Sequence, residues 1–106
     1  MPKLVELRVY VAKPDKLEDL VERWERHYLE IFREHETILG WYVAHPAGKD
    51  MPTGVALLLE HADRAAADRT FMAVKTDPRM ETASGPQGSS LVETWERTFL
   101  YPVEGD

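Results

Sequence analysis

The sequence contains no cysteine, which excludes disulfide bonds, a thiolate nucleophile and metal sites with cysteine ligands. It has no continuous apolar segment long enough to cross a membrane, and its first residues alternate instead of forming an export signal. Positive charge is scarce, because 13 Lys and Arg face 19 Asp and Glu for a net charge of -6. Such a chain repels nucleic acids and anionic membranes at long range. We therefore expect a cytoplasmic protein that binds neither nucleic acid nor membrane.

What the sequence does contain is typical of a single globular domain over residues 1–106. Hydrophobic residues make up 43% and charged residues 30%, a composition that argues against intrinsic disorder. A chain of 106 residues is long enough to bury one core but too short for two. The fold and the function must therefore share that one core.

Alternating apolar and polar side chains predict four strands. In the first of them, Val5, Leu7 and Val9 point to one face, while Glu6 and Arg8 point to the other. The third strand reads VALLLE with almost no polar break, so we expect it to lie in the centre of the sheet. The four predicted strands cover residues 4–11, 39–45, 55–61 and 90–101.

Two main helices separate these strands. Apolar residues at three- and four-residue steps predict a long helix that ends near Glu36, and Asp15 with Glu18 resembles a capping box at its start. Asp63 is expected to cap a second helix over residues 64–75, and a short helical turn is expected after Pro78. The order β-α-β-β-α-β favours a ferredoxin-like α+β fold, in which a four-stranded antiparallel sheet carries two helices on one face.

Both faces of the predicted sheet carry large side chains. In the last strand Trp95 and Phe99 point one way, and Val92 and Leu100 point the other. The face without helices would expose a wide apolar patch in a monomer, and two sheets packed across a twofold axis would cover it. We therefore expect an obligate homodimer, with Trp95 on the sheet face that meets the partner.

Four stretches of the sequence resemble single-domain NIPSNAP-type proteins: VELRVYVAKPDKLEDLVERW, IFREHETILGWYVA, HADRAAADRTFMAVKTDP and WERTFLYP. The resemblance spans residues 4–102. It implies a dimeric α+β barrel made of two ferredoxin-like protomers, each with a pocket between its sheet and its helices. It implies no reaction, because NIPSNAP-type domains mostly lack an assigned one. Relatives in the wider superfamily include cofactor-free oxygenases, lactone isomerases, polyketide cyclases and haem-binding enzymes.

The four histidines are candidates for acid-base chemistry because the imidazole titrates near neutral pH. His27 and His35 lie on or beside the apolar stripe of the long helix, where a proton-transfer role and a purely structural role both fit. His45 and His61 each end a strand. Because those two strands are antiparallel, the two side chains should lie at opposite edges of the sheet, and His45 should be exposed beside its Pro/Gly-rich loop.

Neither a metal nor a cofactor is expected. The sequence has no H-x-x-x-H pair, and no histidine falls in the helix over residues 64–75, where haem-degrading relatives would place a ligand. No serine occupies a strand-to-helix elbow, which argues against a Ser-His-Asp nucleophile.

A set of charged and aromatic residues lies on one face of the first and last strands, which should pair. Charges inside a barrel are costly unless they are matched, so a buried, paired network is expected. Two interpretations stay open: ion pairs that specify the dimer interface, or a ligand site. The set comprises Glu6, Arg8, Tyr10, Glu93, Trp95 and Arg97.

Two functions from different classes remain open. The first is a small-molecule-binding protein that acts as a cofactor-free oxygenase, isomerase or cyclase on an apolar or aromatic metabolite. The second is a non-catalytic dimeric module that binds a hydrophobic ligand or partner. For the first, the catalytic candidates are His27, His35, Tyr10 and Tyr28. The substrate-binding candidates are Trp24, Trp41, Tyr42, His61 and Phe71.

Overall fold

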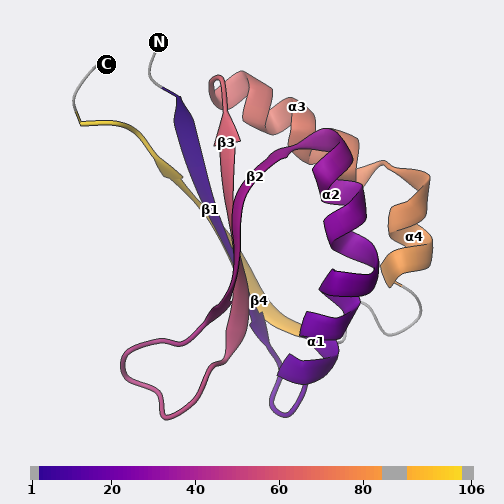
Figure 1. The fold of residues 1–106 in the computed structure, drawn as a ribbon, viewed down its shortest axis with the longest axis vertical. Coiled ribbons are helices and arrows are strands. Elements are labelled where there is room, and N and C mark those ends of the chain that lie inside the picture. The colour runs from indigo at the N-terminus through magenta and orange to yellow at the C-terminus, as the bar shows by residue number, and fades with distance from the viewer. Residues whose placement is uncertain (1–2, 85–90, 104–106) are drawn as a thin grey trace.

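The computed structural model describes residues 3–84 and 91–103, and its core element is a four-stranded antiparallel sheet with the helices on one face (Figure 1). The strands lie in the order β2-β3-β1-β4, which is the ferredoxin-like arrangement that the sequence predicts. The two central strands are therefore β1 and β3, as the apolar run in the third strand indicates. The strands are β1 Leu4–Ala12, β2 Thr37–Ala44, β3 Gly54–His61 and β4 Val92–Leu100.

The strand boundaries differ from the prediction by one or two residues. Strand β2 begins at Thr37, and its pairing with β3 shifts register between Ile38 and Gly40. A Cβ atom at Gly40 would collide with the ring of Tyr42, so glycine makes room there for that ring. The predicted start of the last strand, Ser90, lies outside the described residues.

The helical layer consists of one long composite helix followed by two shorter helices. The long helix runs through α1 Leu17–Arg23, a π-helical segment at Trp24–Tyr28 and α2 Leu29–His35 without interruption. Helix α3 spans Arg64–Lys75 and α4 spans Pro78–Ser84. None of the helices among residues 3–84 and 91–103 combines the length and apolar character needed to cross a membrane.

Of the two helix N-termini predicted from the sequence, one has the predicted cap and the other does not. Asp63 caps α3 as predicted, because its Oδ1 accepts a hydrogen bond from the backbone N–H of Ala66 at 2.7 Å. The capping box at Asp15 is wrong, because the N-cap of α1 is Lys16 and no side chain accepts a hydrogen bond there. Asp15 instead has a φ of 65°, a left-handed conformation that Asp tolerates and that turns the chain out of β1.

The π-helical segment changes which residues of the long helix face the sheet. The backbone N–H of Leu29 donates to the carbonyl of Trp24, five residues earlier. In a regular α-helix two residues five positions apart point about 140° away from each other. The wider π turn brings Leu29 back above Trp24, and both side chains are buried, with 5% and 3% exposure.

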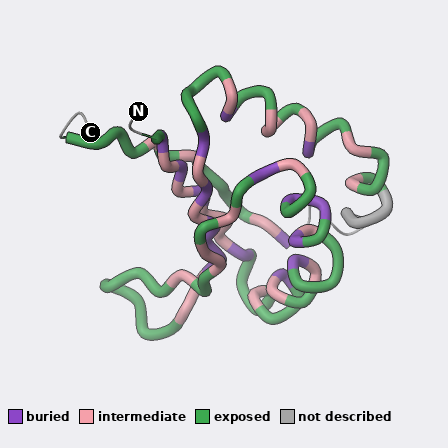
Figure 2. The backbone as a smooth tube through the Cα atoms, turned by 45° about the horizontal axis from the view of Figure 1, so that its top comes forward, coloured by how far each residue is buried: buried purple, intermediate pink, exposed green. Residues whose placement is uncertain are grey.

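The two faces of β1 lie in different surroundings. Glu6, Arg8 and Tyr10 face the helices, since Tyr10 packs on Trp24 with ring centroids 5.2 Å apart. The alternate residues, among them Leu7 and Val9, therefore face away from the helices, where no element of the described chain covers them (Figure 1). Figure 2 shows that buried stretches gather where the strands and the long helix approach each other.

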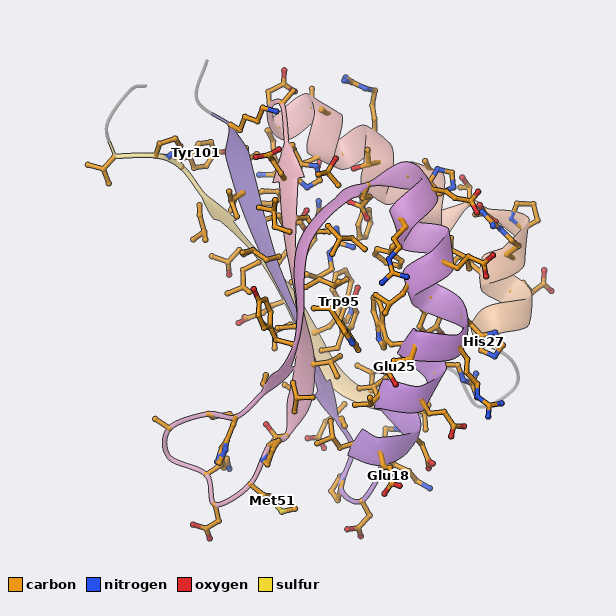
Figure 3. All side chains as sticks on the ribbon, in the orientation of Figure 1. Glu18, Glu25, His27, Met51, Trp95 and Tyr101 are labelled. Atoms are coloured by element: carbon orange, nitrogen blue, oxygen red, sulfur yellow. The ribbon has the colours of Figure 1, made fainter. Side chains whose placement is uncertain are left out.

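The expected position of Trp95 is wrong. Strand register pairs Trp95 with Tyr10, and the two rings stack at 5.7 Å on the helix side of the sheet. Figure 3 shows the Trp95 side chain in the space between sheet and helices. Its ring is 47% exposed because β4 is an edge strand. Trp95 therefore does not belong to the open face of the sheet.

Candidate functional site

A buried ionic cluster, here called the Glu6 network, lies between the sheet and the helices. Its centre is Glu6, whose carboxylate accepts hydrogen bonds from Arg8 Nε at 2.9 Å and Arg97 Nε at 2.7 Å. His61 Nε2 lies 2.9 Å from the other carboxylate oxygen. The remaining member is Glu36, which follows α2. The side chains of Glu6 and Arg8 are 0% and 1% exposed.

Strand register explains why this cluster forms. Arg8 and Arg97 are direct partners across β1 and β4, which places two like charges side by side. Glu6 lies two residues before Arg8 on the same face and can therefore neutralise both guanidinium groups. Burial alone raises the pKa of Glu6, but the hydrogen bond from Arg97 and the charge of Arg8 outweigh burial and hold that pKa below its ordinary value.

Glu36 is the less well matched carboxylate of the network. Its Oε1 accepts a hydrogen bond from the Thr70 hydroxyl at 3.2 Å, while its Oε2 lies 3.7 Å from Arg8 Nη1 and accepts none. Burial raises the pKa of Glu36, and the attraction of Arg8 only partly opposes this. The network thus combines one carboxylate whose pKa is lowered with one whose pKa is raised.

Part of the polar set predicted from the sequence is present in the structure, and it lies on the helix side of the sheet. Glu6, Arg8 and Arg97 do form a buried, paired network, but they lie on the helix side of the sheet and not on the open face where the sheet of a partner is expected to pack. Glu93 takes no part and is exposed. Sequence reasoning missed His61 and Glu36 as members, although His61 pairs with Leu4 in register and so shares the face of Glu6.

The network also offers ligand atoms for a metal ion. Glu6, Glu36 and His61 each have one donor atom within 4.8 Å of the others. Two guanidinium groups, however, already neutralise Glu6, and both would repel a cation placed there. The donor set therefore fits an ion-pair cluster better than a metal centre.

A small cavity lies beside the network, between β1, the long helix and α4. Its volume is about 140 Å³. The walls are aromatic and apolar, and the side chains of Trp24 and Tyr28 meet edge to face at 5.1 Å. Both residues belong to the π-helical segment, and such segments are frequent at functional sites. The described lining residues are Tyr10, Leu20, Trp24, Tyr28, Phe32, Met80 and Val92.

Tyr10 joins the cavity to the Glu6 network. It lines the cavity, and its hydroxyl lies close enough to Arg8 for the charge of the guanidinium group to act on it. Burial raises the pKa of Tyr10 above its ordinary value, although the charge of Arg8 opposes the shift. The phenol is therefore neutral at physiological pH and keeps a proton that it can donate.

Three of the aromatic and tyrosine candidates meet in the cavity, and the others lie outside it. Tyr10, Trp24 and Tyr28 all line it, as the sequence leads us to expect of a pocket between sheet and helices. The ring of Trp41 stacks on the ring of Trp24, with centroids 5.3 Å apart. Phe71 packs against Trp95 at 6.0 Å and lies under the guanidinium groups of Arg8 and Arg97. Tyr42 pairs with Ala56 on the open face of the sheet and is 52% exposed.

None of the four histidines is among the described residues that line the cavity. His27 is exposed on the outer side of the long helix (Figure 3). His35 Nε2 lies 2.9 Å from the carboxylate of Asp77. His45 is exposed and donates from Nε2 to the carbonyl of Lys49 at 2.8 Å, whereas His61 is buried against Glu6. His45 and His61 lie at opposite ends of the sheet, as predicted.

A second and wider hollow lies at the other end of the long helix. This groove of about 700 Å³ runs between the turn after β1 and the β2–β3 hairpin, where Figure 3 labels Glu18 and Met51. Charged side chains such as Lys13, Lys49 and Glu93 line it. It contains none of the candidate site residues.

The fold is shared with solved structures of several bacterial proteins. An uncharacterised NIPSNAP domain protein from Burkholderia xenovorans is 19% identical, with a TM-score of 0.79 over 97% of each chain. A NIPSNAP family protein from Agrobacterium tumefaciens is 19% identical, with a TM-score of 0.81 over 99% of this chain and 90% of that chain. A proposed antibiotic biosynthesis monooxygenase from Bacteroides thetaiotaomicron is 21% identical, with a TM-score of 0.63 over 97% and 91%.

Sequence comparison assigns this chain to a family. No curated protein matches it. The NIPSNAP family model matches residues 5–105 and so covers the whole sheet, the helical layer and the cavity between them. The chain therefore belongs to the NIPSNAP family.

Proposed function

We propose that this protein binds a small apolar or aromatic molecule in the cavity at the π-helical segment. The observation that carries the proposal is the cavity itself, because its described lining is aromatic and apolar, with polar groups only on Tyr10, Trp24 and Tyr28. Ligand pockets are typically apolar concavities with a few fixed polar groups. Tyr10, Trp24 and Tyr28 are the residues that contact the ligand.

A cofactor-free enzyme is the second candidate, and the position of the Tyr10 hydroxyl within reach of the charge of Arg8 favours it. A neutral hydroxyl donor next to a buried cation can stabilise an oxyanion that develops on a bound substrate. The protein with the same fold that is described as a proposed antibiotic biosynthesis monooxygenase makes an oxygenase one of the reaction types to test. Acid-base roles for His27 and His35 stay predictions, because both lie outside the described cavity lining.

We also propose that the protein works as a homodimer. The sheet face opposite the helices carries Val5, Leu7, Val9, Leu58 and Tyr42, and the described chain leaves it uncovered. A second copy packed sheet to sheet would remove this apolar surface from water. The dimer would also leave the cavity accessible, since the cavity lies on the other face of the sheet.

Binding can be tested by filling the cavity. We expect toluene to shift the backbone NMR signals of Tyr10, Trp24 and Tyr28 in the wild-type protein. Val92→Phe puts a ring into the cavity and should abolish these shifts, whereas Val43→Phe, on the exposed edge strand, should retain them. Equal toluene shifts in both variants, or shifts confined to other residues, would reject the cavity as the binding site.

A further inference from the structure

Helix α4 forms one wall of the cavity through Met80. Most of the remaining described lining belongs to the long helix, where Leu20, Trp24 and Phe32 are 1%, 3% and 3% exposed. Met80 is only partly buried where it packs against this core. The cavity is half open, and α4 lies beside the π-helical segment (Figure 1). The contacts that a ligand makes on this side therefore depend on where α4 holds Met80.

A polar cluster, here called the Asp77 cluster, ties the start of α4 to the end of α2. It comprises Glu34, His35, Asp77 and Arg79. Arg79 donates to Glu34 from Nη1 at 2.7 Å and from Nη2 at 3.1 Å. It also donates to Asp77 from Nε at 3.0 Å and from Nη2 at 2.8 Å, and His35 Nε2 lies 2.9 Å from Asp77 Oδ2. The hydrogen bonds from Arg79 hold the pKa of both carboxyl groups below its ordinary value, so both are charged at neutral pH.

The Asp77 cluster fixes the direction of Met80. The backbone N–H of Met80 donates to the carbonyl of Asp77 at 2.9 Å, so the residue that binds the Arg79 side chain also holds the first turn of α4. Consecutive side chains of a helix point about 100° apart. With Arg79 held on Glu34, α4 cannot turn about its axis without breaking these hydrogen bonds, and Met80 stays directed at the cavity.

These contacts hold α4 weakly. The side chains of Arg79 and Glu34 are 43% and 55% exposed, and ion pairs between exposed groups stabilise a protein only slightly. The flexible thioether side chain of methionine also adapts to irregular spaces. The wall formed by Met80 can therefore shift at a small cost in free energy, unlike the buried residues of the long helix.

We infer that Met80 determines how far a ligand extends toward α4, and that Arg79 is the residue that positions Met80. This inference rests on the proposed function and deepens it, because it names the residue that selects among ligands of different size. The ligands concerned are apolar or aromatic, since the Met80 side chain offers them only methylene groups and a thioether.

The first test compares two probes by NMR titration. Toluene has one ring, and indane adds a fused five-membered ring with two further carbon atoms. We expect Met80→Ala to raise the ratio of the indane affinity to the toluene affinity roughly 3- to 10-fold, as partial burial of two carbon atoms predicts. Met80→Val is a milder change that should shift the ratio in the same direction. Met72→Ala, an exposed methionine on α3, is the matched control and should leave the ratio unchanged.

The second test needs no ligand. The methyl signal of Met80 should be displaced by ring currents from the aromatic lining, away from the methyl signals of the exposed Met51 and Met72. Arg79→Gln removes the charge that binds Glu34 and Asp77, so it should move the Met80 signal toward theirs. The same variant should raise the indane-to-toluene ratio about 1.5- to 5-fold. Glu81→Gln, an exposed substitution on α4, should change neither the signal nor the ratio.

The outcomes separate this inference from the binding function. If toluene shifts the signals of Trp24 but Met80→Ala leaves the ratio unchanged, the role of Met80 is wrong and the cavity remains a binding site. If Arg79→Gln lowers only the melting temperature and leaves the Met80 signal in place, its role in positioning is wrong. If neither probe shifts the Trp24 signals in the wild type or in Met80→Ala, the proposed function itself is rejected.

Discussion

Glu6 is the residue on which the interior of this protein depends electrostatically, because it alone bridges two arginines that strand register places side by side. A buried ion pair contributes little compared with a well-packed apolar pair, but removing one member leaves the other as an uncompensated buried charge. Here the removal of Glu6 would leave Arg8 with Glu36 at 3.7 Å and Arg97 with the exposed Asp68 at 3.9 Å, both more distant than Glu6 is. The aromatic rings of Phe32 and Phe71 near Arg8 offset only a small part of that cost.

We therefore predict that Glu6→Gln lowers the free energy of unfolding by about 3–5 kcal/mol. Urea denaturation at pH 7 measures the free energy of unfolding of the wild type and the variant. Both curves are fitted with the same dependence of that free energy on urea concentration. Glu93→Gln is the matched control, because Glu93 is exposed on β4 and belongs to no ion pair in the described network. Its effect should stay within about 0.5 kcal/mol. Equal stability of the two variants would show that the network is not energetically coupled.

Glu36 should affect stability in the opposite direction. Its pKa in the folded protein lies above the reference value of 4.5, mainly because it is buried. The folded state then binds more protons than the unfolded state between the two pKa values, so stability falls as pH rises through that window, and the loss persists at neutral pH. The depressed pKa of Glu6 has the reverse effect, since its contribution is present above 4.5 and is lost as pH falls.

It follows that Glu36→Gln should be more stable than the wild type at pH 7 and that the difference should vanish below pH 4.5. Denaturation midpoints measured across this pH range provide the test. Glu30→Gln, at an exposed position on α2, the helix that Glu36 follows, should show no gain in stability that depends on pH. A Glu36→Gln protein that is less stable than the wild type at neutral pH would mean that attraction to Arg8 outweighs the cost of burial.

Among the secondary-structure elements, the π-helical segment has the greatest influence on the site. The spacing of Leu20, Trp24 and Tyr28 fits a regular α-helix, but Leu29 would then turn away from the sheet. One extra residue in the turn at Trp24–Tyr28 allows both halves of the long helix to bury their apolar side chains. Trp24 and Tyr28, the first and last residues of this segment, both line the cavity.

Deleting Arg26, which is exposed within this segment, should restore a regular α-helix and rotate one half of the helix relative to the other. Either Trp24 or Leu29 would then lose its place in the core, at a cost of about 2–5 kcal/mol. Circular dichroism should show retained helix content with a lowered melting temperature. Deletion of the exposed Lys49 in the β2–β3 hairpin is the control, and we expect a much smaller effect. A stable Arg26 deletion would show that the π turn is dispensable for packing.

The elements themselves were predictable because their periodicities are strong, whereas two features of the site were not. The alternation in β1 groups Tyr10 with Glu6 and Arg8 on one face, and the apolar stripe of the long helix predicts that Trp24 and Tyr28 face the sheet. The side of the sheet that holds Glu6 and Arg8 could not be predicted, since charged strand residues usually avoid the interior and only the register with Arg97 and His61 makes them compatible with burial. The outward position of His27 depends on the π turn, and no periodicity in the sequence indicates such a turn.

For the whole molecule, the uncovered face of the sheet leads to a prediction about assembly. Sedimentation at micromolar concentration should show about twice the chain mass of 12.2 kDa. Leu7→Glu places a charge in the middle of the open face and should give the mass of one chain. Met72→Glu alters an apolar and more exposed position on α3 and should remain dimeric. A folded wild-type monomer, or dissociation caused by Met72→Glu instead of Leu7→Glu, would contradict sheet-to-sheet pairing.

The Glu6 network draws its members from β1, β3, β4 and the end of α2, four places that lie far apart along the chain. Evolution therefore cannot change Glu6, Arg8 or Arg97 at neutral cost, because each of these exchanges leaves a buried charge without its partner. We expect lineages that lose Glu6 to have lost Arg8 and Arg97 as well, and to have replaced all three with apolar residues. Correlated replacement of these three residues among homologous proteins would show that they have evolved together to keep the buried charges balanced.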